Sequence, residues 1–359
     1  MMDFCNLGAN LSKVCVWRIH LYAGCEGWRE RGLHMKRVYC WLFPIMIGFI
    51  PALLVSADDD DYLETLEDAS GEPLNTDMSY YNDRKRPPVR LTGREEIEWG
   101  EFDDTDVTTF RTTATGEIQF PITKKYFGSV SGRTGITTTN FNGDNQFIDT
   151  GKSSGRPWSD LYEVALRFRS KYVINDRWGL AVASWMTSRW EQGSSLSDGL
   201  RGAGAIGATY NVGDKFNFIA GVAVSSKMLT GGTSVNPLAQ FSWMIDERHT
   251  FSTTGLGLQL RSQWSKTITT NIYAKYTGRR WRLDDRNDGV VDGGSLRDRK
   301  VPIGMGVQWK FLKDWQLRTD LGLVAYRKLQ TTDEDGDSVD SVTSNAPGVF
   351  GSLRVRRRF

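Results

Sequence analysis

The sequence predicts an all-β protein, an antiparallel transmembrane β-barrel of about 12–14 strands that follows a flexible N-terminal segment. Three observations lead to this prediction. Long runs alternate apolar and polar residues, short turns and long polar connections follow one another along the chain, and aromatic residues lie at the ends of the runs. The chain has 37 glycines and 13 tryptophans, with a mean hydropathy of -0.41, and this composition suits strands better than helices.

The run over residues 300–326 shows the alternation most clearly. Its apolar positions are Val301, Ile303, Met305, Val307, Trp309 and Phe311. The residues between them are polar or small, and a second alternating run follows after the polar break at 312–315. Because successive strand residues point to opposite faces, each run has one apolar face. We therefore expect a hairpin of two long strands whose six apolar side chains face the membrane.

The first 57 residues differ from the rest. Residues 35–57 combine a short basic start, an apolar stretch and a small-residue cleavage site ending at Ala57, the pattern of a secretory signal peptide. An N-terminal membrane anchor is the alternative, and Pro44 and Pro51 weigh against it. Residues 1–34 are interpreted as an upstream extension from a mis-assigned start. Export through the general secretory route to a bacterial outer membrane is expected.

Cleavage after Ala57 would change the chemistry of the mature chain. All four cysteines precede that site, so disulfides, a cysteine nucleophile and thiolate metal sites are excluded. Six basic and three acidic residues leave from totals of 45 and 43, so the remainder is nearly neutral and nothing indicates nucleic-acid binding. Residues 58–87 contain nine carboxylates by position 77 and predict an acidic, flexible periplasmic leader.

Residues 88–359 are expected to form the barrel. Strand-like runs recur at 107–121, 127–140, 159–173, 178–191, 200–212, 216–228, 236–245, 255–263, 267–282, 300–311, 316–328 and 345–359. Tight polar turns alternate with long connections at 141–158, 191–199, 229–235, 283–299 and 329–344. A barrel with periplasmic turns and external loops has this rhythm. The centre breaks it, and we expect a stunted hairpin over 251–263, at the external rim or folded inward.

Strand length and aromatic placement favour lipid over a soluble core. The runs are near the length that crosses a bilayer obliquely and longer than the usual strands of soluble proteins. Rings lie at the predicted interfaces: Trp178, Phe216, Trp264 and Trp315 beside the turns, and Trp158, Trp190 and Trp281 toward the other end. The polar faces also carry too many charges for a dry core. A secreted β-sandwich is the alternative fold.

The chain ends in an alternating strand that stops on Phe359, the apolar terminal residue typical of outer-membrane barrels. Arg357 departs from that pattern, because it occupies the apolar face, and we expect it at the periplasmic rim. With the turn-plus-aromatic units at 175–178, 213–216 and 312–315 and the segment 236–282, residues 88–359 resemble an uncharacterised family of bacterial outer-membrane β-barrel proteins. The resemblance implies no activity. It does imply recognition of the C-terminal strand by the barrel-assembly machinery.

Catalysis and metal binding have little support in the sequence. His249 is the one histidine after Ala57, and an odd separation from Ser252 would put the two side chains on opposite strand faces. The acidic stretches 284–289 and 333–337 depart from the EF-hand pattern, although loose divalent-ion binding is an alternative to solvated loops. We predict no catalytic residue, cofactor or metal site. A lipid-modifying enzyme is retained as a less favoured alternative.

The polar faces predict a wet lumen with a basic lining. The lumen candidates are Glu163, Arg167, Arg169, Lys171, Lys310, Arg318, Asp320, Arg354, Arg356 and Arg358. Such a lining favours a passive pore or transport-like barrel for small polar or anionic solutes. A non-conducting structural or adhesion barrel, with its charges paired across a narrow interior, is the alternative. Outer-membrane lipid and small anionic solutes are the expected partners.

Overall fold

The computed structural model describes residues 89–359, apart from 103–104, 122, 124, 143–156, 230–231, 286–290 and 292. The predicted extension 1–34, signal peptide 35–57 and acidic leader 58–87 lie outside the described residues. The described part is built from fifteen strands. No helix long and apolar enough to cross a bilayer occurs among the described residues.

The strands vary from 5 to 18 residues in length. They are β1 (Val89–Phe102), β2 (Thr105–Pro121), β3 (Tyr126–Asn142), β4 (Leu161–Val173), β5 (Trp178–Glu191), β6 (Leu200–Val212), β7 (Phe216–Ser226), β8 (Thr233–Met244), β9 (His249–Thr253), β10 (Leu256–Gln263), β11 (Ile268–Arg282), β12 (Ser295–Trp309), β13 (Trp315–Thr332), β14 (Ser338–Thr343) and β15 (Gly348–Arg358).

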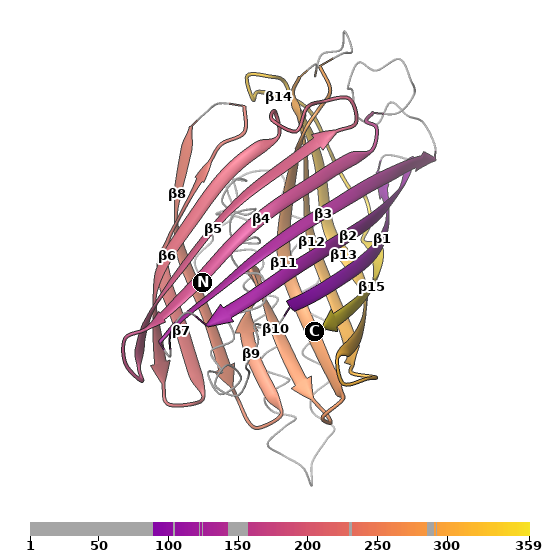
Figure 1. The fold of residues 1–359 in the computed structure, drawn as a ribbon. Coiled ribbons are helices and arrows are strands. Elements are labelled where there is room, and N and C mark those ends of the chain that lie inside the picture. The colour runs from indigo at the N-terminus through magenta and orange to yellow at the C-terminus, as the bar shows by residue number, and fades with distance from the viewer. Residues whose placement is uncertain are drawn as a thin grey trace, which may run out of the picture. The chain divides into compact units, whose positions relative to one another are not determined.

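One antiparallel sheet closes on itself (Figure 1). Consecutive strands pair from β1 to β13, and β15 joins β13 to β1. The short strand β14 pairs with the upper part of β13, while β15 pairs with its lower part. The ring therefore counts fourteen strands, which confirms the predicted fold class. Closure leaves nearly every strand with two partners, so few backbone groups lie at a sheet edge.

The two classes of connection lie at opposite ends of the barrel, as predicted. One end, called the short-turn end below, carries the turns at 174–177, 213–215, 245–248, 264–267 and 310–314. Both ends of the described chain also lie there, because the Phe359 N–H donates to the Val89 carbonyl at 2.9 Å. The long-loop end carries the connections after β3, β5, β7 and β11. The connection from β1 to β2 is a short exception at this end, where Phe102 pairs with Thr105.

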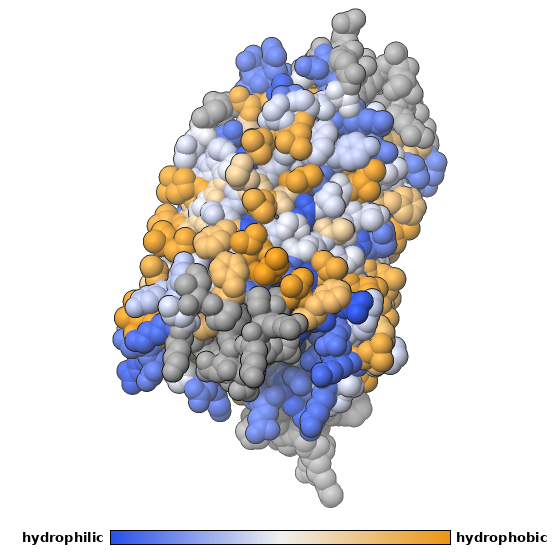
Figure 2. All heavy atoms as spheres, viewed as in Figure 1, coloured by the Kyte–Doolittle hydropathy of each residue, from blue (hydrophilic) through white to orange (hydrophobic). Residues whose placement is uncertain are grey.

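The outward face of the wall is apolar. Leu166, Val235, Met305 and Leu321 are 55%, 65%, 58% and 66% exposed, whereas the adjacent residues Ala165, Ser234 and Asp320 are buried. Figure 2 shows apolar residues over the middle of the visible face and hydrophilic residues toward both ends. A soluble protein rarely leaves so many large apolar side chains open to water. This arrangement fits a wall that faces hydrocarbon.

A bulge in β12–β13 changes which residues face inward. Val301 pairs with Tyr326 and Pro302 with Val324, so Ala325 is one extra residue in β13. Proline has no N–H to donate, and sheets accommodate it at such irregularities. Below the bulge the inward residues of β13 have even numbers, and above it they have odd numbers. Simple alternation along 300–326 therefore misassigns the upper half of the hairpin.

The stunted central hairpin exists, but the prediction that it lies at the external rim or folds inward is wrong. Strands β9 and β10 are 5 and 8 residues long and pair in register with β8 and β11 at the short-turn end (Figure 1). Above the hairpin tip at 254–255, β11 instead approaches β5, where Arg282 pairs with Trp190 in parallel. The two short strands thus narrow the barrel toward the long-loop end.

Candidate functional site in the lumen

The inner wall is strongly basic. By strand register the inward cations include Arg90, Arg94, Arg111, Arg133, Arg167, Arg169, Lys171, Arg189, Arg201, Arg261, Lys275, Arg279, Lys300, Arg318, Arg327, Arg354, Arg356 and Arg358. The inward carboxylates are Glu96, Glu98, Glu117, Glu163, Glu191, Asp298 and Asp320. Cations thus outnumber carboxylates, so the interior of the described barrel attracts negative charge.

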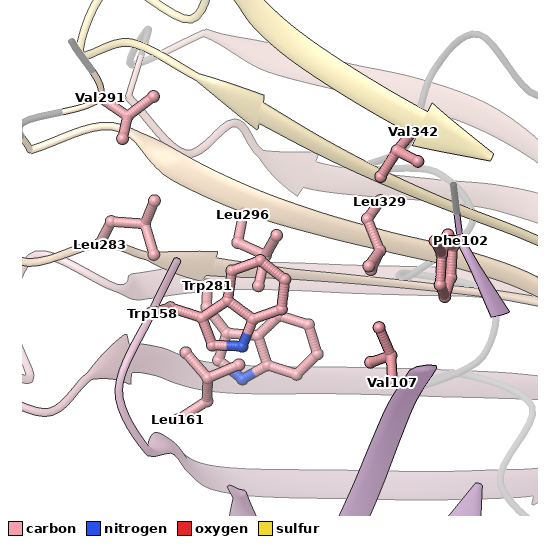
Figure 3. Packing of buried hydrophobic residues seen from close by; sticks show 10 residues of the cluster. All are labelled: Phe102, Val107, Trp158, Leu161, Trp281, Leu283, Val291, Leu296, Leu329 and Val342. Carbon is pink, nitrogen blue, oxygen red and sulfur yellow. The ribbon is translucent and has the colours of Figure 1, made fainter. Parts of the chain in front are cut away.

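An apolar cluster, called the plug below, packs inside the barrel at the long-loop end (Figure 3). It consists of Phe102, Val107, Trp158, Leu161, Trp281, Leu283, Val291, Leu296, Leu329 and Val342, each at most 4% exposed. These residues come from seven strands and from two connections at that end. Phe141 and Val339 pack against the cluster. These apolar side chains occupy space that a water-filled passage would need at this end.

Two tryptophans predicted for the outer girdle belong to the plug. Trp281 lies on the inward face of β11 with Tyr273, and Trp158 packs edge-on against Phe141 at 5.0 Å. The girdle prediction is therefore wrong for both residues. Trp190 does face outward, where its ring stacks on Tyr162 at 5.8 Å. A tryptophan near a strand end can face either the lipid or the lumen. A shift of one residue along the strand decides which, so the position alone did not predict the face.

Below the plug, Glu163 gathers three arginines. Its carboxylate accepts hydrogen bonds from Arg111 and Arg133, and from Arg189 Nη2 at 3.1 Å. The three donors come from β2, β3 and β5, so the cluster spans four neighbouring strands. Glu163 is only 2% exposed. One carboxylate among three guanidiniums leaves local positive charge even after every bond is made.

A second cluster of ion pairs links β1 to β12 and β13, which lie on the other side of β15. Glu98 bonds to the Lys300 ammonium and lies 2.9 Å from Arg327 Nη1. Arg327 also donates to both oxygens of Asp298, at 3.0 and 2.9 Å. Lys300 lies 3.5 Å from Glu96. All five side chains are largely buried and the charges nearly balance, so this cluster links strands of the wall and offers little net charge to an ion.

Toward the short-turn end, three arginines lie side by side. In the sheet register Arg354 stands directly opposite Arg94 on one side and Arg318 on the other. We call these three residues the arginine row. Arg94 pairs with Glu96, and Arg318 makes a two-pronged contact with Asp320, with distances of 2.7–3.0 Å. Arg354 makes no hydrogen bond or ion pair with any described residue of the barrel. Like charges directly opposite destabilise a sheet, so the row suits an anion.

The remaining lumen candidates are distributed along the same wall. Arg167, Arg169 and Lys171 lie on the inward face of β4. Arg356 and Arg358 follow Arg354 on β15, and Arg356 Nε donates to Thr92 Oγ1 at 3.3 Å. Lys310 differs, because it lies in the exposed turn after β12. Burial and the nearby Arg261 and Arg358 lower the pKa of Lys310 below its ordinary value.

Aromatic side chains surround the outer wall at the short-turn end. Trp178 contacts Tyr210 at 4.5 Å, Trp309 contacts Phe311 at 5.5 Å, and Trp264 is half exposed. Arg357 lies at this rim, with its guanidinium carbon 5.1 Å from the Trp315 ring centre and 4.3 Å from that of Phe359. These side chains have the position of an interfacial girdle.

Of the six residues predicted to face the membrane, one is buried. Met305, Val307, Trp309 and Phe311 are exposed, and Ile303 is half-buried. Val301 is 2% exposed and packs in a cluster with Trp185, Leu238 and Tyr276. The cluster forms where β9 and β10 end early and β11 approaches β5. Nothing in the local alternation of β12 signals that change.

Chemistry beyond ion pairing finds little basis in the described residues. His249 Nδ1 contacts the Asp246 carboxylate at 2.9 Å, which holds the pKa of Asp246 below its ordinary value. Ser252 instead receives a hydrogen bond from Gln259, at 3.1 Å. No group of three metal-ligating side chains occurs within the described ranges. Of the two acidic stretches, 333–337 forms a turn closed by the Asp333 carboxylate, and 286–290 lies outside the described residues.

The sequence interpretation missed the partners that organise the lumen. Arg111, Arg133 and Arg189 come from three strands, and their convergence on Glu163 depends on strand register. Arg94 lies in a strand whose sequence has four carboxylates within residues 95–101, which concealed its alternation. The sequence signal for Arg111, Arg133 and Arg189 was an isolated charge in a strand-like run with few or no other charges.

The fold and lumen define a closed antiparallel barrel of the transmembrane type. No protein-family model and no curated protein sequence matches the chain. Among solved structures it is similar to an outer-membrane channel of Pseudomonas putida F1, with 10% identity, a TM-score of 0.42, and 77% of this chain and 97% of that one covered. It is also similar to the translocator domain of the autotransporter NalP from Neisseria meningitidis (10% identity, TM-score 0.32, covering 83% and 93%). It is similar as well to the toluene transporter TodX of P. putida, with 7% identity, a TM-score of 0.33, and 79% of this chain and 92% of that one covered. These scores are low, so the function has to be argued from the wall and lumen.

Proposed function

We propose that the protein is an outer-membrane barrel that admits small anionic solutes into a basic lumen from its short-turn, periplasmic end. The apolar outer wall and the aromatic girdle support placement in a bilayer. The predicted secretory signal and the terminal Phe359 support the outer membrane as the destination and the barrel-assembly machinery as a partner. The outward apolar rows of β12 and β13 would contact lipid.

The arginine row carries the functional part of this proposal. Arg94, Arg318 and Arg354 present three guanidiniums toward one part of the lumen, and two buried or half-buried carboxylates offset them only in part. A solute that offers oxyanion acceptors can bind such a set, whereas a cation meets repulsion. Further cations on β4 and β15 extend the same preference along the wall.

The plug supports a second candidate, a non-conducting barrel. Its ten buried apolar residues pack together in the interior at the long-loop end. Under our proposal the plug is a barrier that has to move before a solute can cross. If the plug is permanent, the barrel has a structural role and displays its long connections outside the cell.

Planar-bilayer recording tests the proposal. Refolded protein in a salt gradient should give a reversal potential that indicates anion preference, and Arg354→Gln should reduce the anion-to-cation permeability ratio about fivefold. A unit charge about 8 Å from an ion in water contributes roughly 0.5 kcal/mol, and its removal disfavours the anion and favours the cation by that amount. Arg177→Gln, an equal charge change in an exposed turn, is the matched control.

Two results would contradict the proposal. Absence of conductance steps at every voltage, in the wild type and in plug variants, would favour the structural barrel. A reversal potential that Arg354→Gln leaves unchanged would remove the arginine row from the solute path. Membrane fractionation combined with a heat-modifiability gel tests the location separately, and recovery of the folded protein in the soluble periplasm would overturn it.

A further inference from the structure

Lys171 is a buried cation that the wall leaves without a partner. It lies on the inward face of β4, two residues before the strand ends at the short-turn side, and is 7% exposed. Within the described barrel no carboxylate pairs with its ammonium group, and no hydrogen bond reaches it. Leaving a buried charge uncompensated is costly. A stable protein needs a reason to retain a lysine there.

Lys300 shows how the same wall treats a structural lysine. It is 6% exposed, nearly the same as Lys171, yet Glu98 and Glu96 both pair with its ammonium. The barrel therefore supplies carboxylates where a buried lysine links strands. The cross-strand neighbours of Lys171 are Phe127 on one side and Ala181 on the other. Neither neighbour has a side-chain atom that can accept a hydrogen bond from the lysine.

A second donor lies close to Lys171. Gly179 on β5 pairs with Thr209 on β6, and Lys171 lies one inward position away along β4. A Cβ atom placed at Gly179 would lie 2.7 Å from Thr209 Oγ1 and 3.6 Å from Lys171 Cε. Both side chains thus reach over the same glycine. Thr209 is 1% exposed, and its hydroxyl has no hydrogen-bond partner in the described barrel.

We propose that Lys171 and Thr209, over Gly179, form a binding site for a small oxyanion, most simply a carboxylate. The ammonium group can only donate hydrogen bonds, and the hydroxyl can donate one as well. Two donors that converge on one space are complementary to a group with two acceptor oxygens and a negative charge. The small residues Ala181 and Gly207 pair beside them and leave room for a compact ligand group.

The position suggests a role in the proposed transport. The site lies near the short-turn mouth, on β4–β6, whereas the arginine row lies on β1, β15 and β13. An anion entering from the periplasmic side would meet both walls. This role as a binding site along the path of a transported solute rests on the proposed function, but binding itself does not require conduction.

Ligand binding to the refolded full chain in micelles tests the site. Saturation-transfer NMR with acetate as the probe should show saturable binding to the wild type. Lys171→Gln should weaken acetate binding about tenfold or more, and Thr209→Val about threefold, because a charged hydrogen bond contributes more than a neutral one. Gly179→Ala should also weaken binding without changing charge, because the added methyl would lie 2.7 Å from Thr209 Oγ1 and 2.8 Å from the Tyr172 carbonyl oxygen, so the wall of the site has to shift.

Control variants test whether a loss of acetate binding comes from the site itself. Lys215→Gln makes the same charge change in the exposed β6–β7 turn and should leave acetate affinity unchanged. A heat-modifiability gel checks folding, and Thr209→Val retains the lysine if a charge variant fails to fold. Equal affinity in wild type, Thr209→Val and Gly179→Ala would overturn the site, as would absence of saturable binding to the wild type. Displacement of acetate by equimolar chloride, as effectively as by unlabelled acetate, would overturn the oxyanion class.

The two proposals can fail separately. Acetate binding that depends on Lys171, in a barrel without anion preference in the bilayer, supports the site and contradicts the transport function. Anion-selective conductance without acetate binding supports the function and contradicts the site.

Discussion

Arg357 shows how one residue can break a sequence pattern and still stabilise the structure. It occupies the outward face of the last strand, where an apolar side chain is usual. Its guanidinium group lies over the rings of Trp315 and Phe359, at 5.1 and 4.3 Å. Cation–π contacts at exposed sites contribute roughly 0.5–1 kcal/mol each. The side chain therefore joins the C-terminal residue to the β12–β13 hairpin while its charge stays at the membrane boundary.

Glu163 gives a residue-scale prediction for stability. Glu163→Gln removes the carboxylate that Arg111, Arg133 and Arg189 share and leaves three buried or half-buried guanidiniums facing one another. Removing one partner from a buried ion pair costs about 3–5 kcal/mol. We expect the free energy of unfolding to fall by about that amount in urea titrations of protein refolded into lipid vesicles.

An exposed carboxylate provides the control for that measurement. Glu247→Gln changes the same charge in the turn before β9 and should alter the unfolding free energy by less than about 0.5 kcal/mol. An equally small effect of Glu163→Gln would show that water inside the lumen already screens the cluster. Its role as a buried ion-pair centre would then be excluded.

The contact between Asp246 and His249 predicts a pH effect in a turn. The hydrogen bond from the His249 side chain lowers the pKa of Asp246 below its ordinary 3.8. Hydrogen bonds from the backbone N–H groups of Arg248 and His249 lower it further. A lowered carboxylate pKa stabilises the folded protein above pH 3.8, and the contribution is lost as the pH falls through the folded value.

NMR titration of labelled aspartate carboxyl carbons can measure that shift. In His249→Phe the pKa of Asp246 should rise toward its ordinary value. The internal reference is Asp198 at the long-loop end. Against the opposing effect of burial, hydrogen bonds from Ser195 and Ser197 lower its pKa, and this pKa should not change between the two proteins. If Asp246 titrates identically with and without His249, the histidine contributes nothing to the turn.

At the scale of elements, the bulge at Ala325 coordinates the two halves of the lumen wall. Below it β13 directs Arg318 and Asp320 inward, and above it Arg327 and Leu329. Without the extra residue, one half would turn its charged side chains toward lipid, because a shift of one residue reverses every side chain. The bulge thus lets one long strand serve both the arginine row and the plug.

Deleting Ala325 tests this role of the bulge. The deletion should prevent formation of the heat-modifiable folded barrel, since burying charged residues in hydrocarbon costs about 2–4 kcal/mol each at the midplane. Deleting Asp335 in the exposed β13–β14 connection should have little effect. A folded, heat-modifiable barrel from the Ala325 deletion would show that neighbouring strands absorb the shift and that the bulge does not set the register.

These elements show how far the sequence determines the fold in practice. Alternation, turn spacing and the terminal Phe359 predicted a closed barrel and its two ends, because those signals are local. Val301 and Trp281 were misassigned because their environment depends on non-local events, namely the approach of β11 to β5 and the assembly of seven strands around the plug. The β9–β10 hairpin was predicted to be short, but its height in the wall follows only from pairing with β8 and β11.

At the scale of the whole molecule, the interior is layered along the barrel axis. The apolar plug lies at the long-loop end, the clusters around Glu163 and Glu98 lie beneath it, and the arginine row follows toward the short turns. Charges are nearly balanced in the Glu98 cluster and unbalanced in the arginine row. An anion entering from the short-turn end therefore meets uncompensated cations before it meets the barrier, which is the order a transport-like barrel needs.

The plug gives the prediction that decides between a pore and a structural barrel. Trp281 and Leu296 are neighbours across β11 and β12, and each is at most 2% exposed within the plug. Replacing both with alanine removes much of the apolar volume that closes the interior. We expect the double variant to show larger or more frequent conductance steps than the wild type in planar bilayers, with unchanged anion preference, since the arginine row is intact.

The matched control for the plug variant lies on the outer face of the same strands. Met305 and Leu321 also pair across neighbouring strands and are 58% and 66% exposed. Their double replacement by alanine removes apolar volume from the lipid side and should leave conductance at the wild-type level. Both variants have to give the heat-modifiable folded form. If the plug variant folds and neither it nor the control shows conductance steps, the clusters around Glu163 and Glu98 suffice to close the lumen. The barrel would then be a structural one.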